Sequence, residues 1–246
     1  MARFFVPKKN LSGKRGRIDG QEFVHLRKVL RLGPGDGIVV FDDAGWEHEA
    51  VIRELSTEQA EIEILKSYET ERESTLEITL GVALTKGEKM DFVVEKAAEL
   101  GVQKIAPFSA AFTVPKLDAV KSASRNARWQ KIALSAAKQC GRTQMPEILP
   151  LCTFEALVTS GVKRDLRLIF WESERRQSLA HVHEKYSQAK SVLLAIGPEG
   201  GFSVEEAELA KAHGFEPVRI GRRILHAETA AVAALSLVQF LWGDLH

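Results

Sequence analysis

The feature that most constrains the fold is a change of hydrophobic pattern at Thr75. From there, continuous apolar segments alternate with helical segments, and two of the helices, expected over 88–100 and 126–140, end at Gly101 and Gly141. The strands are expected in the segments LEITLGVAL, QKIAPFSA, LRLIFW and SVLLAIG. Continuous apolar strands joined through helices are typical of a parallel sheet that is covered on both faces. The pattern therefore predicts an α/β fold for residues 75–246.

The first 70 residues have a different pattern. Short apolar runs such as Ile38-Val39-Val40-Phe41 lie between turn segments (GPGDG before, DDAG after), and 60–65 alternates apolar with polar residues. Such short runs bounded by glycine turns indicate β-strands. One helical segment, 21–30, precedes the first turn. We predict a small barrel or sheet with one helix over 1–70, followed by a polar linker at 66–74.

Composition excludes several classes of protein. The chain has 246 residues, of which 45% are hydrophobic and 27% charged; these values exclude disordered, collagen-like and coiled-coil proteins. No apolar run approaches the ~18 residues of a membrane span, and no secretory segment precedes Cys140 and Cys152, so we expect reduced thiols and a cytoplasmic location. His181 and His183 form an H-x-H pair without a suitably spaced third ligand, so no metal site is expected.

The near-neutral net charge of +1 hides an uneven distribution of charge. Residues 1–35 contain nine Lys/Arg and two acidic residues, whereas 36–70 contain two basic and ten acidic residues. A second basic stretch, 116–142, has seven Lys/Arg and one acidic residue. Either stretch alone is also explained by a solvated helix face. Two such stretches together favour a nucleic-acid partner, since clustered bases bind phosphates.

The segment 191–210, SVLLAIGPEGGFSVEEAELA, contains the first candidate site. An expected strand ends in a glycine-rich turn, and a helix then begins with Ser203 and Glu206 at the spacing of a capping box. Glycines at a strand-to-helix turn let the backbone approach a ligand and present free amides to it; a plain tight turn is the alternative. The segment has neither the Gly-Lys-Ser/Thr of a Walker loop nor the G-x-G-x-x-G of a dinucleotide fold.

The second candidate site lies in 217–229, PVRIGRRILHAET, before an apolar helix expected over 230–241. A short strand (218–220) is expected to lead to paired arginines, which either lie solvated at the surface, contact RNA phosphate or act beside the ligand loop. Glu228 and Thr229 suit the first turn of the helix, where they satisfy free amides. No Ser-His-Asp or Cys-His arrangement is present, so the glycine loops point to a bound reactive cofactor.

Together these segments resemble a known family. IGPEGGFS (196–203) and IGRRILHAETAA (220–231) are similar to the two cofactor-loop motifs of the SPOUT methyltransferases. Within them, the chain resembles the bacterial enzymes that methylate N3 of a uridine in 16S rRNA. That closer resemblance rests on RFFVP (3–7), HLRKVLRLGPGD (25–36), KGEKMDFVVEKAAELGV (86–102) and RWQKIALSAAKQCGR (128–142). The matches cover nearly the whole chain in the same order.

The resemblance implies a PUA-like RNA-binding β-barrel over 1–70 and a SPOUT domain with a deep trefoil knot over 75–246. It also implies a homodimer in which each active site is completed by the partner, with 16S rRNA of the small ribosomal subunit as substrate and S-adenosylmethionine as cofactor. The cofactor would contact Leu84, Thr85, Ile196, Gly197, Gly200, Gly201, Ile220, Leu225, His226 and Thr229.

The expected reaction is in-line attack of uridine N3 on the sulfonium methyl group, without a covalent enzyme intermediate. We expect Arg223 to stabilise the uracil anion and Glu228 to accept the N3 proton, besides its capping role. RNA would be held by Arg3, Lys8, Lys9, His25, Arg27, Arg31, Arg128 and Arg142.

The chain departs from the family pattern at one place. His226 and Ala227 stand where the family has Arg-Thr. This departure keeps a second hypothesis open, a non-catalytic RNA-binding or ribosome-assembly protein. A third hypothesis is a SPOUT methyltransferase that acts on another RNA.

Overall fold

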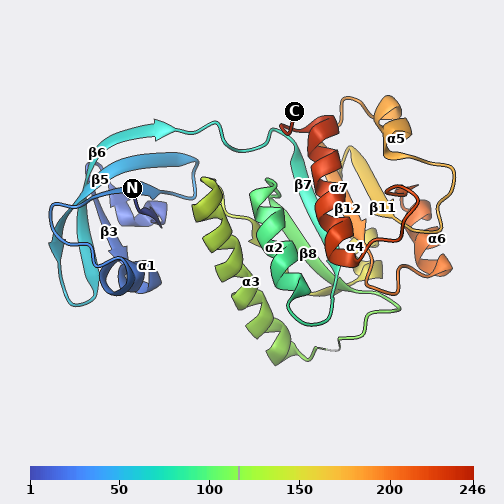
Figure 1. Cartoon of the computed structure of the whole chain (residues 1–246), viewed down its shortest axis with the longest axis horizontal. Coiled ribbons are helices and arrows are strands. Elements are labelled where there is room, and N and C mark those ends of the chain that lie inside the picture. Colours follow the sequence, from blue (N-terminus) through green and yellow to red (C-terminus); the bar gives the residue numbers. More distant parts are fainter. Residues whose placement is uncertain (116) are drawn as a thin grey trace. The chain divides into compact units, whose positions relative to one another are not determined.

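The computed structural model describes residues 1–115 and 117–246 and divides into two compact units (Figure 1). Unit 1 comprises Met1–Glu73 together with Ala137–Met145, and unit 2 comprises Ser74–Ala136 together with Pro146–His246. Lys116, the first residue of the second basic stretch, lies outside the described residues.

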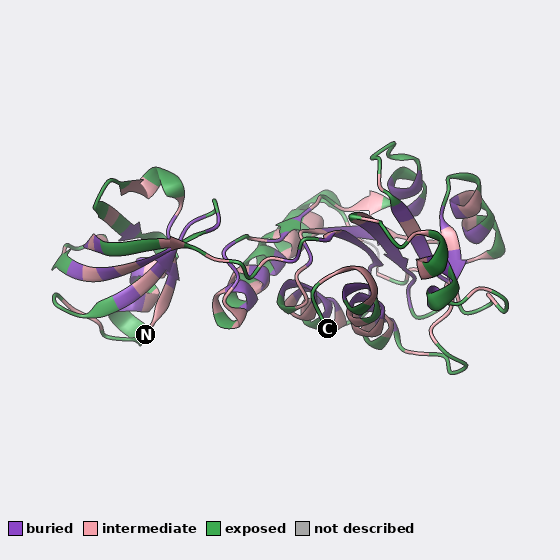
Figure 2. Cartoon of the chain, turned by 90° about the horizontal axis from the view of Figure 1, so that it is seen from above, coloured by how far each residue is buried: buried purple, intermediate pink, exposed green. Residues whose placement is uncertain are grey.

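Unit 1 is a six-stranded sheet with short helices, as the sequence predicts. Its elements are β1 (Arg3–Phe5), η1 (Lys8–Asn10), β2 (Leu11–Ser12), β3 (Arg15–Asp19), α1 (Gly20–Val24), η2 (His25–Val29), β4 (Gly37–Phe41), β5 (Trp46–Leu55) and β6 (Gln59–Glu69). The strand order is β1-β4-β5-β6-β3-β2, and only the β1–β4 pair is parallel. The alternation of buried and exposed residues along these strands, visible in Figure 2, gives the sheet one core face, on which Phe23 and Leu26 of the helical segment pack.

The predicted linker at 66–74 is wrong in its first half. Strand β6 continues to Glu69, because β5 is long enough to pair with it up to the residue pair Trp46 and Glu69. The polar composition that indicated a linker reflects an exposed strand end: Lys66 and Ser67 are exposed. The connection between the units is correspondingly shorter than the sequence suggests.

Unit 2 is the α/β fold that the sequence predicts. Its strands are β7 (Glu77–Ala83), β8 (Lys104–Ser109), β9 (Glu147–Ile148), β10 (Cys152–Thr153), β11 (Leu166–Phe170), β12 (Ser191–Ile196) and β13 (Glu216–Val218). All pairings are parallel, in the order β10-β8-β7-β12-β11-β13, with β9 paired to β8. The helices are α2 (Lys89–Glu99), α3 (Ala119–Cys140, whose last turn belongs to unit 1), α4 (Phe154–Thr159), α5 (Leu179–Lys185), α6 (Val204–Ala212) and α7 (Ala227–Trp242).

Two separate apolar clusters cover the two faces of this sheet. Along β12, Leu194 contributes to one cluster and its neighbour Leu193 to the other, because successive strand side chains point to opposite faces. Residues of α2, α3, α5 and α7 complete the first cluster, and residues of α4 and α6 complete the second. The strands of unit 2 are therefore buried between two helical layers (Figure 2), which explains their continuous apolar sequence.

Some boundaries and short elements differ from the sequence predictions. Strand β13 covers Glu216–Val218 rather than 218–220, since its partner strand β11 ends at Phe170, opposite Val218. Helix α3 starts at Ala119 rather than 126. The short elements α4, α5, β9 and β10 were not predicted because none is long enough to show a period. The threading of a knot stays a prediction.

No helix among the described residues is both long and apolar enough to cross a membrane.

Candidate active site

The carboxyl ends of β11, β12 and β13 open onto a cavity of about 650 Å³. Four segments line it: 170–173 with Arg175 at the end of β11, 196–201 at the end of β12, 218–225 at the end of β13, and Ala227 and Ala230 at the start of α7. The carboxyl ends of parallel strands meet at one edge of a sheet, where α/β proteins bind ligands. The volume falls within the range of about 300–1,000 Å³ that is usual for small-molecule sites.

The first loop, which we call the GPEGG loop (197–201), brings its backbone to the cavity. Gly201 has a φ of +71°, and a Cβ added to it would lie 2.1 Å from Oε1 of Glu172. A Cβ added to Gly200 would lie 2.8 Å from Cβ of Phe112. A side chain at either position would displace Phe112 or Glu172, and the positive φ of Gly201 also favours glycine, so the loop lines the cavity with its main chain.

The helix that follows the GPEGG loop begins with the predicted capping box. The Ser203 hydroxyl accepts a hydrogen bond from the Glu206 N–H at 3.2 Å, and the Glu206 carboxylate accepts one from the Ser203 N–H at 3.0 Å. The carboxylate also accepts from the Ala111 N–H at 2.8 Å. These bonds fix the end of the loop.

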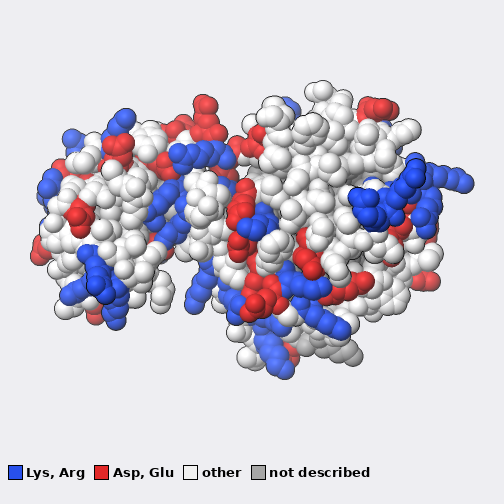
Figure 3. Space-filling model, in the orientation of Figure 1, with Lys and Arg blue, Asp and Glu red and all other residues white. Residues whose placement is uncertain are grey.

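The second loop runs from Arg219 to His226 and carries the paired arginines. Arg222 and Arg223 are exposed, line the cavity, and form no ion pair with any described residue. Figure 3 shows a group of Lys and Arg side chains over the connection from β13 to α7. A parallel bridge between Ser178 and Arg219 ties this loop to the segment after β11. The cavity mouth is therefore rimmed with positive charge.

Most of the predicted catalytic and cofactor-binding residues line the cavity. Those that line it are Arg223, Ile196, Gly197, Gly200, Gly201, Ile220 and Leu225. Leu84 and Thr85 are fully buried after β7 and are outside the lining. His226, Glu228 and Thr229 form the N-cap and first turn of α7 and also lie outside the lining.

Three lining residues, Glu172, Ser173 and Arg175, were not identified from the sequence. They follow β11, and the turn is held by the Glu174 carboxylate, which accepts the Arg176 N–H at 2.6 Å. The predicted strand LRLIFW was a signal that could have identified them, because ligands of parallel sheets bind at the carboxyl ends of the strands.

Two structural observations fit an extended polar cofactor in this region. The main chain of Gly197, Gly200 and Gly201 forms one wall of the cavity, a cradle without side chains of its own. Thr85 Oγ1 is buried and has no hydrogen-bond partner among the described residues, so it is a polar atom whose partner is missing. Buried polar groups are normally satisfied.

One cluster of charges, which we call the Lys89 cluster, comprises Lys89, Glu199 and Glu228. The Lys89 ammonium lies 3.5 Å from Oε1 of Glu199 and 3.3 Å from Oε2 of Glu228. Burial acts to raise the pKa of Glu199, but its own backbone N–H, the Lys86 N–H and the Lys89 ammonium together outweigh it, and this pKa is lowered from its usual value. The cluster therefore favours a charged carboxylate in the GPEGG loop.

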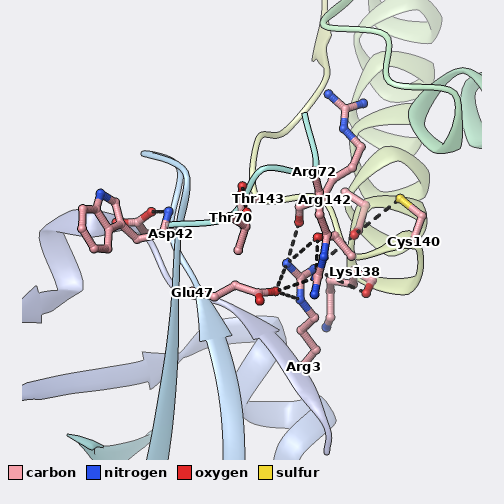
Figure 4. A network of polar contacts seen from close by, with 12 residues as sticks. Arg3, Asp42, Glu47, Thr70, Arg72, Lys138, Cys140, Arg142 and Thr143 are labelled. Atoms are coloured by element: carbon pink, nitrogen blue, oxygen red, sulfur yellow. Dashed lines mark hydrogen bonds and ion pairs between the residues drawn. The ribbon is translucent and has the colours of Figure 1, made fainter. Parts of the chain in front are cut away.

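Arg3, predicted to bind RNA, is engaged inside unit 1 (Figure 4). Its Nε donates to Glu47 Oε1 at 2.7 Å, and its two Nη groups donate to the carbonyl oxygens of Ala137 and Arg142 at 3.1 and 2.7 Å. The guanidinium also lies over the Phe41 ring, 3.9 Å from its centroid. With a side chain 13% exposed, Arg3 is positioned to hold 137–145 against the sheet.

Arg142 is similarly engaged, since its Nη2 lies 2.8 Å from Oε2 of Glu73 and its side chain is 4% exposed. Arg128, in unit 2, is exposed but paired with Asp91 at 2.8 Å through Nε. The remaining predicted RNA contacts lie at the surface of unit 1: Lys8, Lys9, Arg27 and Arg31 are exposed, and His25 is half-buried with its ring near that of Phe4.

Among the described residues, no group of three or more His, Cys, Asp or Glu could hold a metal ion. His183 lies instead against the ring of Trp242, with centroids 4.8 Å apart.

Comparison with known proteins yields consistent matches. Residues 72–239 match the RNA methyltransferase domain family, and 18–65 match the RNA methyltransferase PUA domain family. Two curated relatives are named ribosomal RNA small subunit methyltransferase E. The one from Bacillus subtilis is 29% identical, with 91% of this chain and 89% of the relative covered. The one from Buchnera aphidicola subsp. Schizaphis graminum is 33% identical, with 90% and 88% covered.

Two solved structures are similar over their whole length. A putative methyltransferase from Legionella pneumophila, in complex with the cofactor SAM, superposes with a TM-score of 0.91 at 36% identity, covering 99% of both chains. A ribosomal RNA small subunit methyltransferase E from Neisseria gonorrhoeae, bound to S-adenosylmethionine, gives 0.90 at 35% identity, covering 100% of both.

Proposed function

Because the chain belongs to the ribosomal RNA small subunit methyltransferase E family, we propose that it transfers a methyl group from S-adenosylmethionine to N3 of a uridine in 16S rRNA. The observation that supports this most directly is the GPEGG cradle, which opens onto a cavity rimmed by unpaired arginines. One side of the site suits a small cofactor, and the other suits an anionic polymer.

The GPEGG loop and the second loop hold the cofactor. S-adenosylmethionine, when bound, supplies an electrophilic methyl group on its sulfonium. The backbone of Gly197, Gly200 and Gly201 offers polar contacts, and Ile196 and Leu225 offer apolar ones. Leu84, Thr85, Ile220, His226 and Thr229 complete the proposed set, with the unpaired Thr85 hydroxyl as a further polar contact.

Arg223 carries the electrostatic part of catalysis. As N3 loses its proton, negative charge spreads over the uracil carbonyl oxygens, and the guanidinium at the cavity stabilises it. Glu228 is the proposed acceptor of the proton, held at the start of α7 beside Lys89. The target base must leave its stack to reach the cavity. Arg175 and Arg222 face the same opening and bind the flanking phosphates.

Unit 1 contributes sequence-independent RNA binding. Lys8, Lys9, Arg27 and Arg31 present exposed positive charge, and His25 lies among them on η2. We propose that Arg3 and Arg142 stabilise the unit rather than contact RNA, because their donors already bind protein oxygens. Arg128 retains an exposed side chain and stays in the proposed RNA set.

We also propose that the protein forms a homodimer. Leu237 and Phe240 on α7 are 39% and 58% exposed, and Phe92 on α2 is 45% exposed. Helices α2 and α7 pack together, so these apolar side chains lie on neighbouring helices. Light scattering of the wild type should give twice the mass of one chain, and a mass of one chain would contradict the dimer.

The function is tested by offering three RNAs with labelled S-adenosylmethionine: small ribosomal subunits that lack the modification, naked 16S rRNA, and tRNA. We expect label in the small-subunit RNA. Label in tRNA alone would favour a methyltransferase that acts on another RNA. Neither cofactor binding nor transfer would favour the assembly-protein hypothesis.

A further inference from the structure

Lys89 occupies a position where a cation is locally unfavourable. It is the first residue of α2, and the free N–H groups and macrodipole of a helix N-terminus repel positive charge. The residue that suits such a position is acidic. A departure from local preference beside a functional site calls for a compensating interaction.

The compensation comes from two carboxylates on different elements. Glu199 lies in the GPEGG loop and Glu228 in the first turn of α7, and both are within 3.5 Å of the Lys89 ammonium. The side chains of Lys89, Glu199 and Glu228 are 32%, 29% and 22% exposed. The cluster is therefore partly shielded from water, where ion pairs are stronger than at an open surface.

The carboxylates of Glu228 and Glu199 each have few other hydrogen-bond or ion-pair contacts. Glu228 Oε2 is buried and has no hydrogen-bond donor among the described residues, so the ion pair with Lys89 compensates its burial. Glu199 Oε1 also accepts a hydrogen bond from the Lys86 N–H at 3.3 Å. This bond links the GPEGG loop to the segment between β7 and α2. Three segments around the cofactor cradle are thereby joined at one ammonium group.

We propose that Lys89 is a positioning residue that holds the GPEGG loop in its cofactor-binding conformation by pairing with Glu199 while anchored to Glu228. The inference rests on the proposed function. Three glycines give the loop backbone freedom, and ordering a free loop upon binding lowers affinity. Because the Lys89–Glu199 ion pair already restricts the loop before the cofactor binds, less affinity is lost in ordering it.

The experiment compares Lys89→Met with Lys96→Met. Lys96 is a matched control, because it lies on the same helix and also pairs with two glutamates, Glu95 and Glu99, at 2.7 and 2.8 Å. Calorimetry with S-adenosylmethionine alone should show about tenfold weaker binding for Lys89→Met, because the cofactor must then order a loop that Lys89 no longer holds. Lys96→Met should bind as the wild type does, and Lys89→Arg should restore most of the affinity.

The kinetic readout separates positioning from a general loss of structure. We expect Lys89→Met to raise the KM for the cofactor while the KM for RNA and the melting temperature stay close to wild type. If Lys89→Met does not fold, Glu199→Gln tests the same tether, and we again expect weaker cofactor binding.

Wild-type affinity in a folded Lys89→Met protein, or in Glu199→Gln, would overturn the inference. A wild-type protein that fails to bind S-adenosylmethionine would overturn the proposed function itself, so the two failures are distinguishable.

Discussion

The two units use arginine in opposite ways. In unit 1, Arg3 and Arg142 are nearly buried, and their donors bind Glu47, Glu73 and backbone carbonyls. At the cavity of unit 2, Arg222 and Arg223 are exposed and form no ion pair with any residue of 1–115 or 117–246. Basic residues are frequent in the sequence in both places, so their frequency indicates positive charge without showing which guanidinium groups are free to bind RNA.

Replacing a paired arginine should have the largest effect on stability. Arg3→Met leaves the carboxylate of Glu47, which is 3% exposed, without its closest partner, and we expect a loss of about 3 kcal/mol in the free energy of unfolding. Urea denaturation measures it. Arg53→Met is the control: its pair with Glu63 is exposed, so less than about 1 kcal/mol is expected. Equal losses in the two variants would contradict the structural role of Arg3.

Replacing an unpaired arginine should affect catalysis instead. Arg223→Ala removes the guanidinium at the cavity, and we expect turnover to fall about 100-fold, the usual cost of losing one stabiliser of developing charge. Cofactor affinity and the unfolding free energy should stay near wild type. Unchanged turnover with normal RNA binding would exclude this role.

A smaller effect is expected for Arg175, which lines the cavity mouth. Arg175→Ala should raise the KM for RNA about tenfold and lower the slope of log affinity against log salt by about one, as for a single phosphate contact. Salt-dependent filter binding measures both. Arg176→Ala is the neighbouring control, since Arg176 is exposed but outside the lining. Identical salt slopes for Arg175→Ala and the wild type would contradict the contact.

The smallest expected effect concerns the acid sensitivity of unit 1. Burial lowers the pKa of His48 from 6.5, against the opposing attraction of Asp42. The unfolded chain therefore binds more protons than the folded one between 6.5 and the lowered value. The contribution of neutral His48 to the free energy of unfolding is fully present above this pH window and is lost as the pH falls through it. Urea midpoints at two pH values should differ more for the wild type than for His48→Gln. Equal differences would contradict this contribution.

Local patterns predicted the framework of the site well. The parallel sheet, the GPEGG loop and the capping box of Ser203 and Glu206 follow from periodicity and turn chemistry within short windows. Both predicted candidate segments, 191–210 and 217–229, contribute lining residues to the cavity at the carboxyl edge of the sheet. Arg223, predicted to act beside the ligand loop, is one of them.

Long-range partners could not be predicted. Arg3 and Glu47 are 44 positions apart, and Arg3 and the Arg142 carbonyl are 139 apart, so no local window contains both members. For the same reason, the sequence could not predict that Glu172 lies close to Gly201. The sequence shows which residues carry charge, whereas the tertiary fold decides which charges are neutralised.

The most direct test of the account is to identify the nucleoside formed when the wild-type protein methylates small ribosomal subunits that lack the modification. After digestion of the RNA, chromatography and mass spectrometry locate the added methyl group. The account predicts 3-methyluridine. A methyl group on the ribose, on a carbon of the base or on another nucleoside would contradict it.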